Sequence, residues 1–173
     1  MTATPPPDAE RLYERLLAGV PPLLAGGGVL VGIHTGGAWL AERLHGDLAL
    51  EGEPGLISSA LHRDDFAERG LVIGKGELRS TRLPFEVDGA RIVLVDDVLH
   101  TGRTIRAVVN ELFDFGRPRS IALAVLVDRA GRELPVGAAF AAETLVLDAG
   151  ERLTLARGDD GRFRFETRAA RQD

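Results

Sequence analysis

The chain has 173 residues, 45% of them hydrophobic, and a formal net charge of −5 at pH 7. This length and composition predict one domain with its own hydrophobic core. The sequence contains no cysteine, which excludes disulfides, cysteine-ligated zinc and thiol catalysis and fits a reducing compartment. A net negative charge provides no overall attraction to nucleic acid.

The start of the chain, M-T-A-T-P-P-P-D, lacks the basic and apolar regions of a signal peptide. No apolar run approaches the roughly 20 residues that a membrane-spanning helix needs. We therefore expect a cytoplasmic protein that does not contact membranes. Residues 1–7 end in three prolines and are expected to be a disordered lead, which leaves residues 8–173 as the single domain.

The N-terminal third is predicted to alternate helices and strands. Asp8 is the expected N-cap of a short helix, and the apolar run over 29–33 predicts a strand that a second helix follows. The apolar faces of these two helices carry Leu12, Tyr13, Leu16 and Leu17, and Leu40, Ala41 and Leu44, respectively. Shorter apolar runs over 48–50 and 56–61 predict further strands.

Residues 62–80 carry many charges, three glycines and little apolar periodicity. A weakly structured stretch of this length inside a compact domain is uncommon and is typical of a lid. A surface hairpin with 71–73 as one arm is the plainer alternative, and both descriptions hold if the lid is a hairpin. Residues 85–87 favour an edge strand before the Asp88-Gly89 turn.

The central stretch, 91–107, combines a strand, a polar loop and a helix. The uninterrupted apolar run 92–95 predicts a strand buried on both faces, with Asp96 and Asp97 where it is expected to end. Residues 101–104 (Thr-Gly-Arg-Thr) then lead into a helix. The apolar stripe of that helix carries Ile105, Val108, Val109, Leu112 and Phe113. Such a loop at a helix N-terminus predicts a phosphate cradle, and the acidic pair beside it suits sugar hydroxyls or a metal.

The C-terminal part is predicted to be rich in strands. Residues 121–127 form a second fully buried apolar run, and 145–147 a shorter one. Residues 152–156 and 162–167 alternate apolar and polar side chains around the turn 158–161, which is typical of a hairpin. Together these patterns predict an α/β fold with a central, mostly parallel sheet flanked by helices and a C-terminal antiparallel hairpin.

The stretch V-L-V-D-D-V-L-H-T-G-R-T resembles the phosphoribosyl-diphosphate (PRPP) motif of type I phosphoribosyltransferases. More narrowly, the chain is similar to the family of bifunctional pyrimidine-operon regulators and uracil phosphoribosyltransferases. Supporting segments lie at 31–44, 62–66, 81–87 and 116–135, in the family's order. The PRPP motif indicates the superfamily. Within that superfamily, the continuation V-D-R…R-E-L-P in 116–135 indicates this family.

The resemblance implies a type I phosphoribosyltransferase fold with a flexible lid hairpin. It implies an enzyme that converts uracil and PRPP to UMP and pyrophosphate with Mg²⁺, and regulation of the pyr operon through mRNA binding. The implied ligands and partners are therefore PRPP, uracil or UMP, and pyrimidine-operon mRNA. The implied assembly is a homodimer or a higher homo-oligomer.

The resemblance also assigns the PRPP-binding residues. The expected ligands of the 5′-phosphate are Thr101, Gly102, Arg103 and Thr104. Asp96 and Asp97 resemble the pair that holds the ribose hydroxyls, and with Arg63 they are the expected catalytic residues. Mg²⁺ is expected to be held mainly by PRPP, with one of the two aspartates nearby. The plainer alternatives are a helix capped by Thr101 and a solvated carboxylate pair, but neither explains why both features occur together after a buried strand.

The loop after the first strand matches the family's pyrophosphate loop by position. The expected pyrophosphate ligands are His34, Thr35, Gly36, Gly37 and Arg82. The family usually reads a basic residue, Thr, Arg and Gly there, so Gly36 replaces the arginine and His34 stands where lysine is often seen. Without that guanidinium, pyrophosphate binding depends more on backbone amides, which weakens the prediction of strong catalysis. The alternative is that Gly36-Gly37 is only a tight turn.

By resemblance, the uracil is expected to contact Asp128, Arg129 and Arg132. The segment 142–147 keeps none of the residues that the family shows there, so base specificity is the least supported part of the prediction.

Three functions are compatible with these residues. The first is an enzyme that makes UMP. The second is an attenuation regulator that senses UMP and binds RNA. The third is a degenerate relative that binds nucleotides and has little catalytic activity. RNA binding requires a basic face, and the charges of the first helix nearly cancel. Arginines around the C-terminal turn offer a partial substitute, namely Arg157, Arg162, Arg164 and Arg168.

Overall fold

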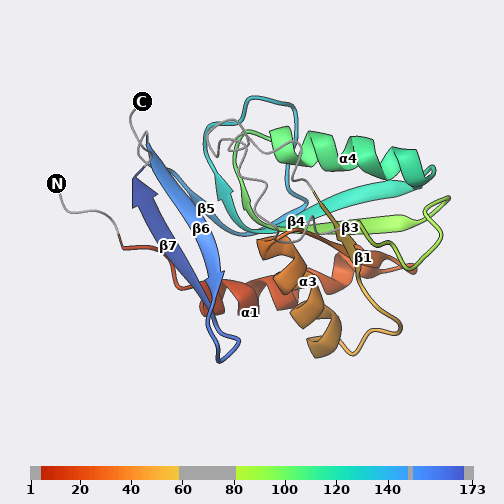
Figure 1. The fold of residues 1–173 in the computed structure, drawn as a ribbon, viewed down its shortest axis with the longest axis horizontal. Helices are drawn as coiled ribbons and strands as arrows, with labels where there is room; N and C mark the ends of the chain where they lie inside the picture. Colours follow the sequence, from red (N-terminus) through yellow and green to blue (C-terminus); the bar gives the residue numbers. More distant parts are fainter. Residues whose placement is uncertain (1–4, 59–80, 148–149, 170–173) are drawn as a thin grey trace, which may run out of the picture.

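The structure is a computed structural model that describes residues 5–58, 81–147 and 150–169. A five-stranded sheet lies at its centre, with strand order β2-β1-β3-β4-β5 and every neighbouring pair parallel (Figure 1). Its strands are β1 (Val29–Ile33), β2 (Gly55–Ile57), β3 (Arg91–Leu99), β4 (Ser120–Arg129) and β5 (Phe140–Leu145). The predicted α/β fold with a parallel central sheet is therefore confirmed.

Helices cover the two faces of this sheet unequally. Helices α1 (Ala9–Gly19) and α3 (Gly36–Asp47) lie on one face, and α4 (Arg103–Phe115) lies on the other (Figure 1). The short helix α2 (Pro21–Leu24) connects α1 to β1. Alternate residues of β3 enter two separate cores, because Val93 packs on the side of α1 and α3 while Leu94 packs on the side of α4. This alternation explains the uninterrupted apolar run.

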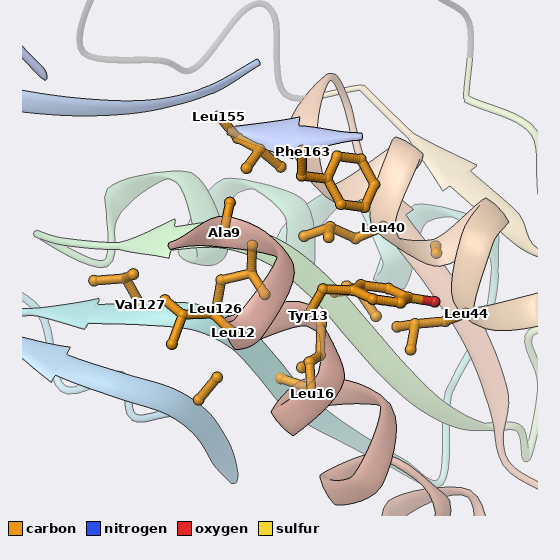
Figure 2. Close-up of a cluster of buried hydrophobic side chains, with 14 of the residues drawn as sticks. Ala9, Leu12, Tyr13, Leu16, Leu40, Leu44, Leu126, Val127, Leu155 and Phe163 are labelled. Carbon is orange, nitrogen blue, oxygen red and sulfur yellow. The ribbon is translucent and has the colours of Figure 1, made fainter. Parts of the chain in front are cut away.

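Helix α1 begins where its cap was predicted. The Asp8 Oδ1 accepts hydrogen bonds from the amides of Glu10 and Arg11, at 3.0 and 3.3 Å. Three residues of the predicted apolar face are buried, namely Leu12, Tyr13 and Leu16. Figure 2 shows them packed with Leu40 and Leu44 of α3 and with Leu126 and Val127 of β4. The Tyr13 hydroxyl donates to Asp47 Oδ2 at 2.7 Å, so the ring also joins α1 to the end of α3.

The C-terminal hairpin of β6 (Glu151–Arg157) and β7 (Phe163–Ala169) closes this core. Its buried side chains are Leu153, Leu155, Phe163 and Phe165. The Arg43 guanidinium donates two hydrogen bonds to Glu10, at 2.9 and 3.0 Å, and lies over the rings of Tyr13 and Phe163. The hydrogen bond from Arg43 holds the pKa of Glu10 below its ordinary value. These contacts fix the hairpin to α1 and α3.

Some predicted strands are wrong. Leu48–Leu50 form no strand, because the amides of Leu48 and Leu50 donate to carbonyls of Leu44 and His45 and so end α3 in a turn. Residues 85–87 form no strand either. They pack into the core on the α4 side, where Val87 is buried, and do not pair with a neighbouring strand. β5 begins at Phe140 instead of Leu145 because it pairs with β4 from Ala124 onwards.

The predicted lid over 62–80 lies outside the described residues. Within the residues that are described, no helix is both long enough and apolar enough to cross a bilayer.

Candidate functional site

Three polar loops meet at one edge of the sheet. Because β1, β3 and β4 are parallel, their carboxyl ends lie at the same edge, where α/β sheets commonly bind ligands. The loop 34–37 follows β1, the loop 100–102 follows β3, and the loop 130–139 follows β4. Helices α3 and α4 begin at the first two of these loops and approach the edge from opposite faces (Figure 1).

The acidic pair lies inside β3 and not after its end, which corrects the predicted strand boundary. β1 pairs with β3 only as far as Val95, whereas β4 continues to pair as far as Leu99. Asp96 and Asp97 therefore occupy the segment of β3 that has lost one neighbouring strand. Asp96 is only 4% exposed and is the one buried charged residue in the described part of the chain. Its Oδ1 accepts a hydrogen bond from the Asp97 amide at 3.0 Å.

The loop after β1 packs directly against this pair. A Cβ atom placed on Gly36 would lie 2.6 Å from Asp97 Oδ2, and one on Gly37 would lie 2.2 Å from the carbonyl oxygen of Val95. Both glycines are buried in the first turn of α3, whose N-cap Thr35 makes no side-chain capping bond. The glycine at position 36, where the family usually has arginine, therefore allows close packing against Asp97. Any side chain there would displace Asp97 or the loop.

The loop after β3 is built around a glycine in a left-handed conformation. Gly102 has φ +92° and is the N-cap of α4, where it makes no side-chain capping bond. The Thr101 Oγ1 accepts from the Arg103 amide at 3.2 Å. The predicted Thr101 cap therefore exists as a hydrogen bond, although the capping position belongs to Gly102. The predicted 5′-phosphate residues 101–104 are contiguous at this helix N-terminus.

The loop after β4 folds back onto the loop after β3. The amides of Glu133 and Leu134 both donate to the Thr101 carbonyl, at 3.0 and 3.1 Å. The Arg103 guanidinium donates to Glu133 Oε2 from Nε at 2.8 Å. Nothing local in the sequence marks Glu133 as the partner of Arg103, because the two are 30 positions apart.

Two of the three residues predicted to bind the base come together. Arg132 Nη2 donates to Asp128 Oδ1 at 2.5 Å, and Arg132 Nη1 donates to the carbonyl oxygen of His100. Arg129 is separate from them. Its guanidinium lies close enough to Glu151 and Arg152 of β6 for their charges to act on it, and burial lowers its pKa. The structure therefore groups Asp128 with Arg132 and directs Arg129 towards the hairpin.

One predicted pyrophosphate ligand, Arg82, does not join the site in the described structure. The Arg82 backbone forms an isolated bridge with Leu56, and its exposed guanidinium pairs with Glu53 Oε2 at 2.8 Å, before the start of β2. This ion pair directs the side chain away from the loop 34–37, which follows the opposite end of the neighbouring strand. Arg63 lies outside the described residues.

The donors at this edge suit a magnesium ion that brings ligands of its own. No group of three or more His, Cys, Asp or Glu side chains that could hold a metal occurs among the described residues. Asp96 and Asp97 supply adjacent carboxylate oxygens, and Mg²⁺ is commonly bound by one or two carboxylates together with substrate phosphates. The pair therefore fits a magnesium ion delivered by a phosphorylated substrate and does not form a protein cage for one.

Comparison with known proteins points to one family. The phosphoribosyl transferase domain family matches residues 16–142. A bifunctional protein PyrR from Ralstonia nicotianae is 49% identical over 168 residues, covering 91% of this chain and 92% of that protein. A bifunctional protein PyrR from Pseudomonas aeruginosa is 44% identical over 153 residues, covering 86% and 88%. These matches confirm the resemblance that the sequence motifs indicated.

Solved structures agree with the fold. A hypoxanthine-guanine phosphoribosyltransferase from Bacillus anthracis superposes with a TM-score of 0.61, covering 84% of this chain and 86% of that one. Its sequence identity is only 16%, so this likeness concerns the fold alone.

Proposed function

Because the chain belongs to the PyrR family of bifunctional phosphoribosyltransferases, we propose that it converts uracil and PRPP to UMP and pyrophosphate, and that UMP in the same site controls binding to pyr-operon mRNA. The observation that carries the enzymatic part is the contact between Asp97 and Gly36. It brings an acidic pair suited to ribose hydroxyls against a helix N-terminus suited to pyrophosphate, and these groups flank the bond that must break.

The 5′-phosphate is held at the N-terminus of α4. Amides of the first turn and the positive end of the helix dipole attract a dianion. Gly102 lets the phosphate approach the backbone closely, and the hydroxyls of Thr101 and Thr104 donate to its oxygens. The phosphate thus anchors the substrate some distance from the reacting C1′ atom, and this binding positions the ribose for reaction.

The ribose hydroxyls donate to Asp96 and Asp97. Two ionised carboxylates accept several hydrogen bonds, and their charge also stabilises the positive character that develops on the ribose as the glycosidic bond forms. Asp96 is buried, and its Oδ1 accepts from the Asp97 amide, so the two carboxylates keep a fixed position at the edge of the sheet.

Pyrophosphate leaves beside the loop 34–37. The amides of Gly36 and Gly37 at the start of α3 bind its oxygens, since neither residue has a side chain in the way. A magnesium ion brought by the substrate would supply charge neutralisation for the pyrophosphate. Asp96 or Asp97 would be the protein group that holds this ion.

The base lies against the loop after β4. Asp128 and Arg132 hold one another, and Arg132 also binds the His100 carbonyl, so the pair has a fixed position beside the PRPP loop. We assign the base contacts to this pair and not to Arg129, whose guanidinium lies near β6.

The enzymatic proposal is tested by measuring nucleotide formation from PRPP and Mg²⁺ with uracil, cytosine, hypoxanthine and guanine. We expect UMP from uracil and little product from the other bases. Tight binding of UMP without turnover of any base would instead identify a nucleotide-binding relative that has lost catalysis.

The regulatory part rests on charge as well as on family. Around the hairpin, Arg162 is exposed, whereas Arg157 lies over the Trp39 ring and 3.8 Å from Glu42. Arg164 lies 3.8 Å from Glu166. Two of these arginines are therefore partly neutralised, and in α1 Glu10 is paired with Arg43. We expect weak RNA binding with a strong dependence on salt.

Titrating a pyr-operon leader RNA at two salt concentrations, with and without UMP, tests the regulatory part. The logarithm of affinity should fall with the logarithm of salt by a slope of roughly −0.7 for each phosphate contact to a single strand. Tight, UMP-stimulated binding that persists at high salt would contradict the charge argument and make regulation the primary function.

A further inference from the structure

The loop after β4 holds two successive peptide groups of the loop after β3. Arg132 Nη1 donates to the His100 carbonyl oxygen. The amides of Glu133 and Leu134 both donate to the Thr101 carbonyl oxygen, at 3.0 and 3.1 Å. Three consecutive residues of one loop thus bond two consecutive residues of the other, which fixes the two loops against each other.

Holding a carbonyl also fixes the direction of the amide that follows it. The peptide groups after His100 and Thr101 are trans, and in a trans peptide group the N–H points away from the C=O. Because both carbonyls point towards the loop after β4, the amides of Thr101 and Gly102 point away from that loop. Gly102 is buried, and its amide donates no hydrogen bond within the described residues, so this donor is left for a ligand.

Arg132 reaches the His100 carbonyl from an anchored position. Its Nη2 donates to Asp128 Oδ1 at 2.5 Å. Asp128 is itself fixed in the sheet, because it pairs with Leu99 of β3 on one side and with Thr144 of β5 on the other. The side chains of Arg132 and Asp128 are only 25% and 26% exposed, so solvent screens this pair less than a surface pair. The planar guanidinium therefore bridges the end of β4 and the peptide that leads into the PRPP loop.

We propose that Arg132 is a positioning residue for the 5′-phosphate site, and that through it the base and the phosphate of a nucleotide bind cooperatively. A base held at Asp128 and Arg132 steadies the peptide between His100 and Thr101. A phosphate held by the amides of Thr101 and Gly102 steadies Arg132 in return, since coupling between two binding sites is reciprocal. This inference rests on the proposed function, which places the base and the phosphate at these two loops.

The neighbouring arginine lacks this connection. Arg129 leaves the same end of β4, but its guanidinium lies near the charges of Glu151 and Arg152. Its Nε has no hydrogen-bond partner within the part of the chain that the structure describes. Arg129 therefore provides a matched control for changes at Arg132.

Binding of ribose 5-phosphate to the full chain, measured by isothermal titration calorimetry, tests the role of Arg132 because this ligand has the phosphate and no base. Arg132→Lys keeps the positive charge but replaces the planar fork with one ammonium group, which cannot bridge Asp128 and His100 in the same way. We expect it to raise the dissociation constant of ribose 5-phosphate by roughly tenfold, within the usual range of coupling between sites. Arg129→Lys makes the same chemical change and should leave that constant unchanged.

A second variant separates the loss of a base contact from the loss of position. Asp128→Asn keeps the shape of the side chain and leaves Arg132 free to bond the His100 carbonyl. It should raise the dissociation constant of UMP by roughly tenfold, as expected for a lost hydrogen bond to a charged group. The dissociation constant of ribose 5-phosphate should rise by less than roughly threefold, because the phosphate loop keeps its support. Thermal melting by circular dichroism should show that every variant is folded at the assay temperature.

The results separate three cases. If Arg132→Lys weakens the binding of UMP and leaves that of ribose 5-phosphate unaffected, Arg132 only contacts the base and the proposal is overturned. Equal weakening of ribose 5-phosphate binding by Arg129→Lys also overturns it, because the bridge to His100 would then not be the cause. An unaltered chain that binds neither UMP nor ribose 5-phosphate would remove the nucleotide site itself, and with it both the proposed function and the coupling.

Discussion

The loops after β1 and β3 both depend on glycine, but for different physical reasons. Gly36 has an ordinary backbone conformation, and what a side chain would have to displace is the Asp97 carboxylate, 2.6 Å from the Cβ position. At Gly102 the nearest side-chain atoms lie 3.3–3.4 Å from the Cβ position and would have to move only by a few tenths of an ångström, so what chiefly favours glycine is φ +92°. The first loop is constrained by close packing against the acidic pair, and the second by its own backbone.

This difference determines what a substitution disturbs. A side chain in the first loop pushes on Asp97 and therefore on the chemistry. A side chain in the second loop strains the chain and therefore affects mainly stability and phosphate binding. Changes in the two loops should consequently separate catalytic effects from effects on the fold.

The largest effect is expected from removing the group that the first loop packs against. Asp96→Asn/Asp97→Asn keeps the shape of both side chains but replaces negative charge and halves the capacity to accept hydrogen bonds. Turnover should fall by roughly a thousandfold or more, the scale of losing electrostatic stabilisation of a transition state. The melting temperature, measured by circular dichroism, should change little or rise. Near-normal PRPP-dependent turnover would remove the pair from the site.

Gly36→Ala is expected to have the second-largest effect on turnover. The new methyl group would meet Asp97, and a displacement of about 1 Å in an active site can reduce the rate by about 100-fold. We expect kcat to fall by roughly 10- to 100-fold with a smaller change in the KM for PRPP. Gly46→Ala is the matched control, because nothing lies within 4 Å of its Cβ position. If both alanine variants keep full activity, the loop is not coupled to the acidic pair.

The sequence predicted most of the elements that hold these loops. The runs 29–33, 92–95 and 121–127 are uninterrupted because each strand is buried on both faces, and the helix stripes follow from a period of 3.6 residues. The predictions failed where apolar residues serve the core without forming strands, as at Leu48–Leu50 and 85–87. Local patterns cannot separate these cases, because both bury apolar surface.

The site was less predictable than the fold. The contiguous groups 96–97 and 101–104 could be located from one motif because strand, loop and helix lie in sequence. The partners of Arg82 and Arg103, and the separation of Arg129 from Asp128, could not be located in this way. These features depend on contacts between segments that are distant in the sequence. They also depend on the face of the strand from which each side chain projects.

Gly102→Ala should test the conformational constraint on the second loop. A residue with a Cβ atom in the left-handed region costs about 1–2 kcal/mol, so the free energy of unfolding should fall by about that amount in chemical denaturation. The KM for PRPP should rise by roughly tenfold, while kcat changes less. The opposite pattern, with kcat lost and stability intact, would mean that the two loops are constrained in the same way.

The smallest effect is expected at the ion pair that joins the second loop to the segment after β4. Glu133→Gln removes the carboxylate that Arg103 binds, and both side chains are about half exposed, at 52% and 51%. An exposed pair of this kind contributes about 0–1 kcal/mol to stability, because water screens the charges and the side chains lose freedom. Stability should therefore hardly change. The released guanidinium is then available to the 5′-phosphate, so the KM for PRPP should fall by up to roughly threefold.

The control is Arg103→Gln, measured in parallel, which should raise the KM for PRPP. The double variant Arg103→Gln/Glu133→Gln should match Arg103→Gln alone. A rise in KM for Glu133→Gln would show instead that Glu133 orients Arg103 towards the phosphate and that the pair is part of the second loop's cradle.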